Sequence, residues 1–209
     1  MTESENAHAK KRAIRKHVRA LRDAASPADR AAWSAEICAQ ALASPLYAAA
    51  RTVHVFLSFQ SEIDTAAIIE HALTHGKRVV APVFMHNSDE TPCTQIDTLD
   101  SEAFDVGKWT MRTPKALRPA PLDAIDIVFV PMVAWAGVCV AGGCVAGGTE
   151  PAGYGRVGYG AGYYDRFLAR LRPGVPRIGL AFALQRVDDI PIEPHDVLLD
   201  DVLTNGVAL

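Results

Sequence analysis

Hydrophobic residues near the start of the chain recur at helical spacing within a basic stretch. Ile14, Val18 and Leu21 fall on one face, which predicts an amphipathic helix from about residue 7 to residue 23. A Ser-Pro-Ala-Asp sequence then begins at Ser26 and has the order typical of a helix start. A second helix is therefore expected to run to about Ala43.

The next apolar runs switch to the shorter period of strands. Residues 52–57 and 78–83 are β-branched and apolar and predict two strands, with a helix between them that opens at Asp64 and Thr65 and closes at Gly76. This βαβ order implies a parallel sheet with a right-handed crossover. Further along, the same patterns predict a strand over 127–130, a helix over 163–171 and a strand over 177–182.

The fold class expected from these elements is α/β, a three-layer sandwich with a mostly parallel sheet. A chain of 209 residues with 49% hydrophobic and 22% charged residues suits one soluble domain, here taken as 1–209. Residues 86–122 show poor periodicity, and the tail from Asp188 carries only short apolar pieces. No regular element is predicted in either segment.

Net charge and cysteine usage limit the partners and the compartment. A formal net charge of -3 removes the general argument for binding nucleic acid or an anionic membrane. The four cysteines make no disulfide framework, and no secretory segment is evident, so a cytoplasmic location is expected. Cys139 and Cys144 are separated by four residues in the sequence and have no histidine nearby, which disfavours a zinc site. The uncharged stretch 127–149 is rich in glycine and reads as a buried strand and a long loop rather than a membrane span.

The two ends of the chain carry opposite charge. Basic residues crowd positions 10–22 and acidic residues crowd positions 188–201, which indicates either one polar site built from both ends or two solvated faces. Lys11 and Arg15 lie one helical turn apart and share a face, which suits two ligands for one polyphosphate. Three further cations of this helix, Lys16, Arg19 and Arg22, are interpreted as a solvated face.

A glycine-dense stretch, 153–165, is the most informative part of the sequence. Successive glycines allow backbone N–H groups to converge on an anion, and Arg156 could add a fixed cation, so phosphate binding is expected. The alternative is a tight turn that serves only helix packing. A formal dinucleotide-binding fingerprint at 153–158 is judged accidental, and no Walker A motif is present.

The stretch from Arg156 to Arg166 closely resembles the signature of the 5-formyltetrahydrofolate cyclo-ligase family, also called methenyltetrahydrofolate synthetase. Further matches follow the family's order and span nearly the whole chain: 11–15, 56–65, 130–134 and 193–196. The resemblance implies an α/β sandwich similar to sugar-phosphate isomerases and CoA transferases. It also implies a monomeric enzyme that uses ATP and Mg²⁺ to convert 5-formyltetrahydrofolate to 5,10-methenyltetrahydrofolate through a phosphorylated formyl group, releasing ADP and phosphate.

The resemblance also implies the site residues. As catalytic residues it implies Lys11, Arg15, Arg156 and Tyr163. For the nucleotide it implies Lys11, Arg12, Ala13, Ile14, Arg15, Arg156, Val157, Gly158, Tyr159, Gly160, Ala161, Gly162, Tyr163 and Tyr164. For the folate it implies Leu57, Glu62, Trp109, Tyr159, Gly160, Ala161, Gly162 and Tyr163. For magnesium it implies Asp165 and Asp196.

The chain departs from the family at two places. Tyr159 and Ala161 stand where relatives often carry basic residues, so fewer cations of the loop would touch a phosphate. Residues 136–154 look like an insertion, either a lid beside the site or a harmless surface loop. Two other functions stay open on these grounds, a non-catalytic folate- or nucleotide-binding homologue and a sugar-phosphate isomerase on a similar fold.

Overall fold

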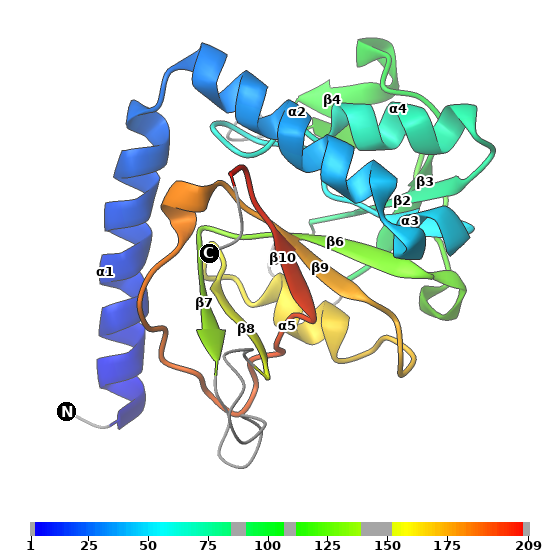
Figure 1. Cartoon of the computed structure of the whole chain (residues 1–209). Helices are drawn as coiled ribbons and strands as arrows, with labels where there is room; N and C mark the ends of the chain where they lie inside the picture. Colours follow the sequence, from blue (N-terminus) through cyan, green and yellow to red (C-terminus); the bar gives the residue numbers. More distant parts are fainter. Residues whose placement is uncertain (1–2, 85–90, 107–111, 139–151, 207–209) are drawn as a thin grey trace.

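The central feature of the computed structural model is a six-stranded sheet in the order β10-β9-β6-β1-β2-β3 (Figure 1). The structure describes residues 3–84, 91–106, 112–138 and 152–206. The strands of this sheet are β1 (Thr52–His54), β2 (Arg78–Pro82), β3 (Cys93–Ile96), β6 (Ile127–Pro131), β9 (Arg177–Leu180) and β10 (Asp201–Leu203). All neighbouring strands are parallel except β3, which pairs antiparallel with β2. The expected mostly parallel sheet is confirmed.

Helices cover both faces of the sheet. The two faces of β6 show the division: Ile127 and Phe129 join the core beneath one helical layer, and Val128 and Val130 join the core on the other face. The first layer consists of α2 (Pro27–Ala43), α3 (Pro45–Ala49) and α4 (Ala66–Thr74), and the second contains α5 (Tyr163–Leu168). This is the three-layer arrangement expected from the sequence.

The first helix, α1 (Glu3–Ala24), stands apart from these layers along one side of the molecule (Figure 1). Val18 on its inner face packs in a small apolar cluster with Val133, Val157 and Ile190. The expected start of the next helix is confirmed, because the Asp29 N–H donates to Ser26 Oγ at 3.0 Å. Packing of Val18 with Ile190 holds the basic helix against the carboxyl-terminal part of the chain.

An antiparallel hairpin of β7 (Ala134–Val138) and β8 (Gly153–Val157) lies beside α1. Strand β7 lies near the start of the segment that the sequence predicts as a long loop. Strand β8 consists of the first five residues of the glycine stretch 153–165. Glycine misled the sequence reading here, since a Cβ on Gly155 would lie only 2.6 Å from the Ile192 side chain. The central residues 139–151, with Cys139 and Cys144, lie outside the described residues, and an insertion relative to the family stays a prediction.

Several other elements differ in length from expectation. β1 ends at His54, β9 ends at Leu180 and α5 ends at Leu168, each three or fewer residues before the expected end. Regular elements missed by the sequence reading are β3, β10, α3 and a small hairpin of β4 (Phe104–Val106) and β5 (Arg112–Pro114). Within the described ranges, none of the helices combines the length and apolar character required for a membrane span.

Candidate functional site

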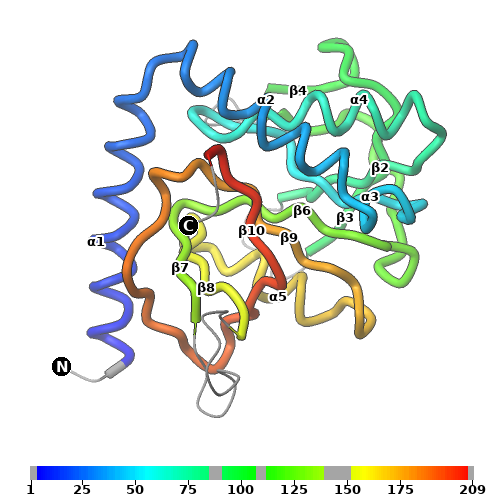
Figure 2. Tube along the Cα trace, in the orientation of Figure 1, coloured from blue at the N-terminus to red at the C-terminus, as the bar shows by residue number. Residues whose placement is uncertain are grey.

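A buried lysine joins the two oppositely charged ends of the chain. The acidic tail runs beside α1 (Figure 2), and Lys11 Nζ donates to Asp196 Oδ2 at 2.6 Å and to Glu193 Oε2 at 3.0 Å. Only 7% of the Lys11 side chain is exposed, and its hydrogen bond lowers the pKa of Glu193. The hypothesis of one polar site built from both ends is confirmed over that of two solvated faces.

The glycine loop 158–162 follows β8 and lies against the same face of α1. Arg15 Nε donates to the Gly158 carbonyl at 2.7 Å, and a Cβ on Gly160 would lie 3.5 Å from the Arg15 guanidinium carbon. Gly160 and Gly162 have φ of 107° and 64°, conformations that side chains rarely adopt. Burial lowers the pKa of Arg15, and the charge of Asp196 opposes that shift. The loop is thus built around a fixed cation from the first helix.

Arg156 ends in a buried ion pair. Its Nη2 donates to Asp165 Oδ1 at 2.7 Å, and the same oxygen accepts the Val197 N–H at 3.3 Å. Burial lowers the pKa of Arg156, and the charge of Asp165 opposes that shift most strongly. Because Val197 follows Asp196, this contact brings the two expected magnesium ligands close together. The charge of Arg156 is thus already matched by a carboxylate.

The two aspartates suit a magnesium ion by the chemistry of their donors. Among the described residues, hydrogen bonds reach one oxygen of each carboxylate, Oδ1 of Asp165 and Oδ2 of Asp196. No group of three His, Cys, Asp or Glu side chains in the described ranges could hold a metal alone. Mg²⁺ commonly takes one or two carboxylates together with water and phosphate oxygens, so a pair suffices.

A second buried network lies two helical turns further along α1. Arg22 is 1% exposed, and its Nη2 donates to the Tyr159 hydroxyl at 2.9 Å. The Glu62 carboxylate accepts the Phe59 N–H at 3.1 Å, and Tyr159 interacts with it closely enough to affect its pKa. Burial raises the pKa of Glu62 to about 7, and the Tyr159 hydrogen bond and the Arg22 charge oppose that shift. Two of the expected folate residues therefore meet.

The burial of Arg22 corrects the sequence interpretation of α1. Leu21, counted in the apolar stripe, is 44% exposed, whereas Arg22, taken as solvated, points inward. Arg22 lies seven residues after Arg15 and eleven after Lys11, so all three share one face. That spacing is the signal that could have found it. Arg19 is exposed, and its guanidinium carbon lies 5.9 Å from the centre of the Tyr159 ring.

Other expected site residues lie at different depths. Tyr163 is buried, donates its hydroxyl to the Pro92 carbonyl at 2.9 Å and packs against Phe84 at 4.8 Å between ring centres. Tyr164 is buried beside it and Leu57 packs against the core of the opposite face. Further residues expected at the site have these positions: Arg12 and Ala13 are exposed on α1, Ile14 is half-buried, Val157 is buried at the end of β8, and Trp109 lies outside the described residues.

Two more residues touch the site without having been expected there. Glu193 shares Lys11 with Asp196, as described above. Arg166 donates to the Ala161 carbonyl at 2.9 Å, and a Cβ on Gly162 would lie 2.9 Å from its guanidinium. The loop therefore contacts arginines on both sides although it carries none between residues 158 and 162.

Fold and site together define an α/β protein whose polar groups gather beyond the carboxyl ends of parallel strands, where such folds bind ligands. The model of the 5-formyltetrahydrofolate cyclo-ligase family matches residues 7–205. The chain belongs to this family, which is a family of enzymes.

Relatives agree along most of the chain. A 5-formyltetrahydrofolate cyclo-ligase of Escherichia coli K12 is 28% identical over 190 residues, 90% of this chain and 96% of the relative. The mouse enzyme of the same name is 25% identical over 204 residues, 92% of both chains. The solved methenyltetrahydrofolate synthetase of Aquifex aeolicus has a TM-score of 0.72 at 21% identity and 95% coverage of both chains. The likeness to that structure supports the fold.

Proposed function

We propose that this protein catalyses the ATP- and Mg²⁺-dependent closure of 5-formyltetrahydrofolate to 5,10-methenyltetrahydrofolate, with release of ADP and phosphate. The observation that carries the proposal is the convergence on one place of the basic helix, the glycine loop and the acidic tail. Lys11 meets Asp196, Arg15 meets Gly158, and both contacts cross more than 140 residues of sequence. Family membership supports the same reaction.

Cations and carboxylates divide the work in this proposal. Lys11 and Arg15 hold the triphosphate against the 158–162 loop, because charge-assisted hydrogen bonds are the strong contacts to phosphate. Asp165 and Asp196 would hold a magnesium ion, which would supply positive charge against the triphosphate. The Lys11 contact with Asp196 supports this assignment, since it joins the cation assigned to the phosphates and the carboxylate assigned to the metal.

The reaction needs an activated formyl group, because an amide-like oxygen leaves poorly. In the proposed sequence the formyl oxygen attacks the γ-phosphorus and ADP departs. N10 of the folate then adds to the activated carbon and loses its proton, and the oxygen leaves as phosphate. Catalysis is mainly positioning and charge neutralisation, the tasks for which buried Lys11 and half-buried Arg15 are suited.

Glu62 is the residue best suited to orient the folate. A pterin ring offers N–H donors, and a carboxylate accepts them. Glu62 lies with Arg22, Pro131 and Leu180 around a gap too narrow to admit a water molecule, and the last two lie at the carboxyl ends of β6 and β9. The proposal therefore sets the pterin outside this gap, beyond the strand ends, with the glycine loop between it and the nucleotide.

The test is an absorbance time course with purified protein, 5-formyltetrahydrofolate and ATP, with and without Mg²⁺. Growth of the near-ultraviolet band of the methenyl product only when ATP and Mg²⁺ are both present is the expected result, with one ADP formed per product. Lys16→Met, an exposed position on the outer side of α1, serves as the matched control and retains full activity.

Two results would contradict the proposal. Retained folate binding without product would instead support a non-catalytic homologue. Product formation that does not depend on ATP would exclude the phosphorylated intermediate.

A further inference from the structure

Arg22 is a buried cation whose position the reaction scheme above does not explain. Its guanidinium donates through Nε to Ser61 Oγ at 3.0 Å and through Nη2 to the Tyr159 hydroxyl at 2.9 Å. Ser61 in turn donates to Asp23. Burying a charge is costly unless it is paired and hydrogen-bonded, so these contacts explain how the fold accommodates a fully buried arginine. They also fix the guanidinium in one orientation.

The Tyr159 hydroxyl links the fixed Arg22 guanidinium to the Glu62 carboxylate. An arginine can only donate, so the hydroxyl oxygen accepts from Arg22 and its own proton is available to the Glu62 carboxylate, whose pKa the interaction with Tyr159 lowers. Arg22, Tyr159 and Glu62 form a chain of contacts from helix to loop to carboxylate, called the Arg22 triad below. Tyr159 is 40% exposed, so its outer surface is open to a ligand while its hydroxyl is held from within.

The triad adds a cation from α1 to a loop that contains none of its own. Residues 158–162 contain no charged side chain, and the nearest arginine in sequence before them, Arg156, is paired with Asp165. Arg22 and Glu62 border the same narrow gap at the strand ends. A positive charge supplied from α1 therefore lies beside the carboxylate that is suited to receive the pterin.

We propose that Arg22 is a positioning residue for the folate end of the site: held by Ser61 and Tyr159, it orients Glu62 toward the folate. The proposal rests on the proposed function for the identity of the ligand. The contacts of Arg22 themselves are independent of that identity, so they can be tested in the protein without ligand.

The groups around Glu62 explain why Arg22 should matter for its ionisation. Those that face it are Arg22 from α1, Tyr159 from the loop and Tyr164 from α5, and Asp23 reaches the network through Ser61. Arg22 is the cation in this set. Without it, the burial that already raises the pKa of Glu62 to about 7 would act with less opposition.

The experiment compares Arg22→Met with the wild type in two measurements. The first is NMR titration of isotope-labelled glutamate carboxyl carbons without ligand, in which the Glu62 midpoint should rise by about one pH unit in the variant. The second is calorimetric binding of 5-formyltetrahydrofolate at neutral pH, where the dissociation constant should rise about tenfold and recover at alkaline pH. The KM for ATP should change less than about twofold.

Further variants separate positioning from general damage to the fold. Tyr159→Phe removes one hydroxyl from a partly exposed side chain and should reproduce most of both effects. The double variant with Arg22→Met should then add little, because the two residues act in series. Arg22→Lys keeps the charge but not the forked geometry, so it should restore the titration midpoint more than the affinity. Lys16→Met should change neither measurement.

The proposal and the assigned reaction fail in different ways. An unchanged Glu62 midpoint in Arg22→Met, or equal losses toward ATP and folate, would overturn the role of Arg22. A wild-type protein that makes no methenyl product would overturn the reaction, whereas a shifted Glu62 midpoint would still support the positioning role.

Discussion

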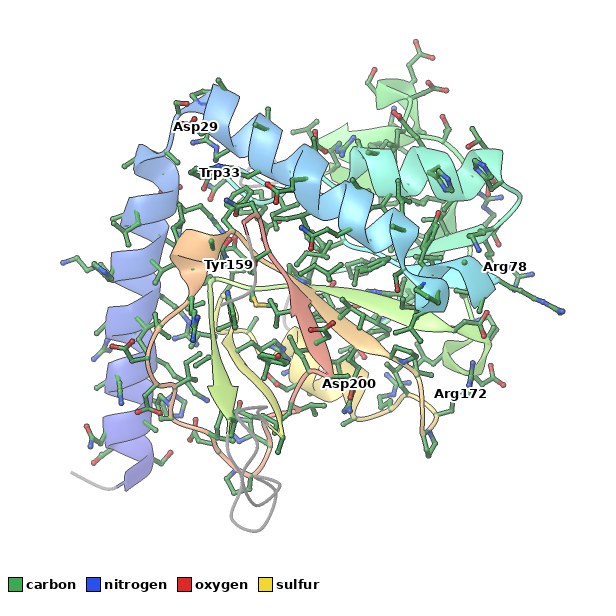
Figure 3. The ribbon with its side chains drawn as sticks, viewed as in Figure 1. Asp29, Trp33, Arg78, Tyr159, Arg172 and Asp200 are labelled. Atoms are coloured by element: carbon green, nitrogen blue, oxygen red, sulfur yellow. The ribbon has the colours of Figure 1, made fainter. Side chains whose placement is uncertain are left out.

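The charged residues at the two ends of the parallel strands differ in their burial and in their ion-pair partners. The larger hollow, of about 450 Å³, lies at the amino ends of β9 and β10 and is bordered by Arg172, Arg177 and Asp200. Its charges are paired locally and remain partly exposed, as in the Arg177–Asp200 pair at 2.5 Å. In Figure 3, Tyr159 lies beside α1, well away from Arg172 and Asp200.

At the carboxyl ends, by contrast, the cations are buried, and the partners of Lys11 and Arg22 are distant in sequence. Lys11, Arg22 and Arg156 are each less than 9% exposed. Lys11 reaches across 185 residues to Asp196, whereas Arg177 reaches across 23 to Asp200. Buried charge is costly to maintain and surface pairs contribute little, so the two ends indicate that burial of charge, rather than the size of a hollow, marks the site.

Among the substitutions that test this comparison, Arg156→Met should have the largest effect on stability. Arg156→Met removes the cation and leaves Asp165, only 18% exposed, without its ion-pair partner. Breaking a buried pair on one side typically lowers the free energy of unfolding by about 3 to 5 kcal/mol. Urea denaturation checks this value, and the double variant Arg156→Met with Asp165→Leu should recover much of the loss. A loss under about 1 kcal/mol would contradict the buried pair.

Lys11 is the next position in order of effect. Lys11→Ala should lower kcat/KM for ATP about 100-fold and that for the folate much less, because its charge is assigned to the triphosphate. Steady-state kinetics with each substrate varied in turn measure the two values. Tyr163→Ala should do the reverse, although Tyr163 is buried, so its folding must be checked in parallel. Equal losses toward both substrates would contradict this division of labour.

His54 is an ionisable residue inside the central sheet, and it tests how strongly burial opposes a charge there. It is fully buried, stacks on Phe167 at 4.4 Å, and neither ring nitrogen has a hydrogen-bond partner among the described residues. Burial lowers its pKa from 6.5 to about 3. The unfolded chain therefore binds one more proton between these values, so His54 costs stability as the pH falls through that window.

The comparison of His54→Leu with the wild type isolates this effect. At pH 7 the variant should be as stable or more stable, because it leaves no polar ring atom unpartnered. Below about pH 6.5 its advantage should grow by about 1.4 kcal/mol per pH unit. Thermal unfolding followed at several pH values measures the gap. If the free energy of unfolding of both proteins changed equally with pH, His54 would be protonated as readily in the folded protein as in the unfolded chain, which would contradict the prediction.

Local periodicity was sufficient for the main helices and the βαβ order, because each depends on residues close in sequence. It failed where a distant partner decides. Leu21 and Arg22 exchange their expected environments because Ser61 and Tyr159 provide hydrogen bonds that no local pattern contains. Gly155 lies in a strand because Ile192 leaves no room for a side chain.

The candidate site shows the same limit. The resemblance to the family brought Lys11, Arg15, Asp165 and Asp196 to attention, and the structure gathers them. The Arg22 contacts came only from the fold, since the family motifs that were matched do not include this position.

The smallest expected effect is at the opposite end of the strands. Arg177 donates to Asp200 through two nitrogens, and this hydrogen bond raises the pKa of Arg177, yet both side chains are about one-third or more exposed. Water competes for such a pair, so Arg177→Ala should lower the free energy of unfolding by less than about 1 kcal/mol. Activity should remain at the wild-type level, because the pair lies at the amino ends of the strands. A loss of activity comparable to that of Lys11→Ala, with the fold intact, would mean that the larger hollow takes part in catalysis.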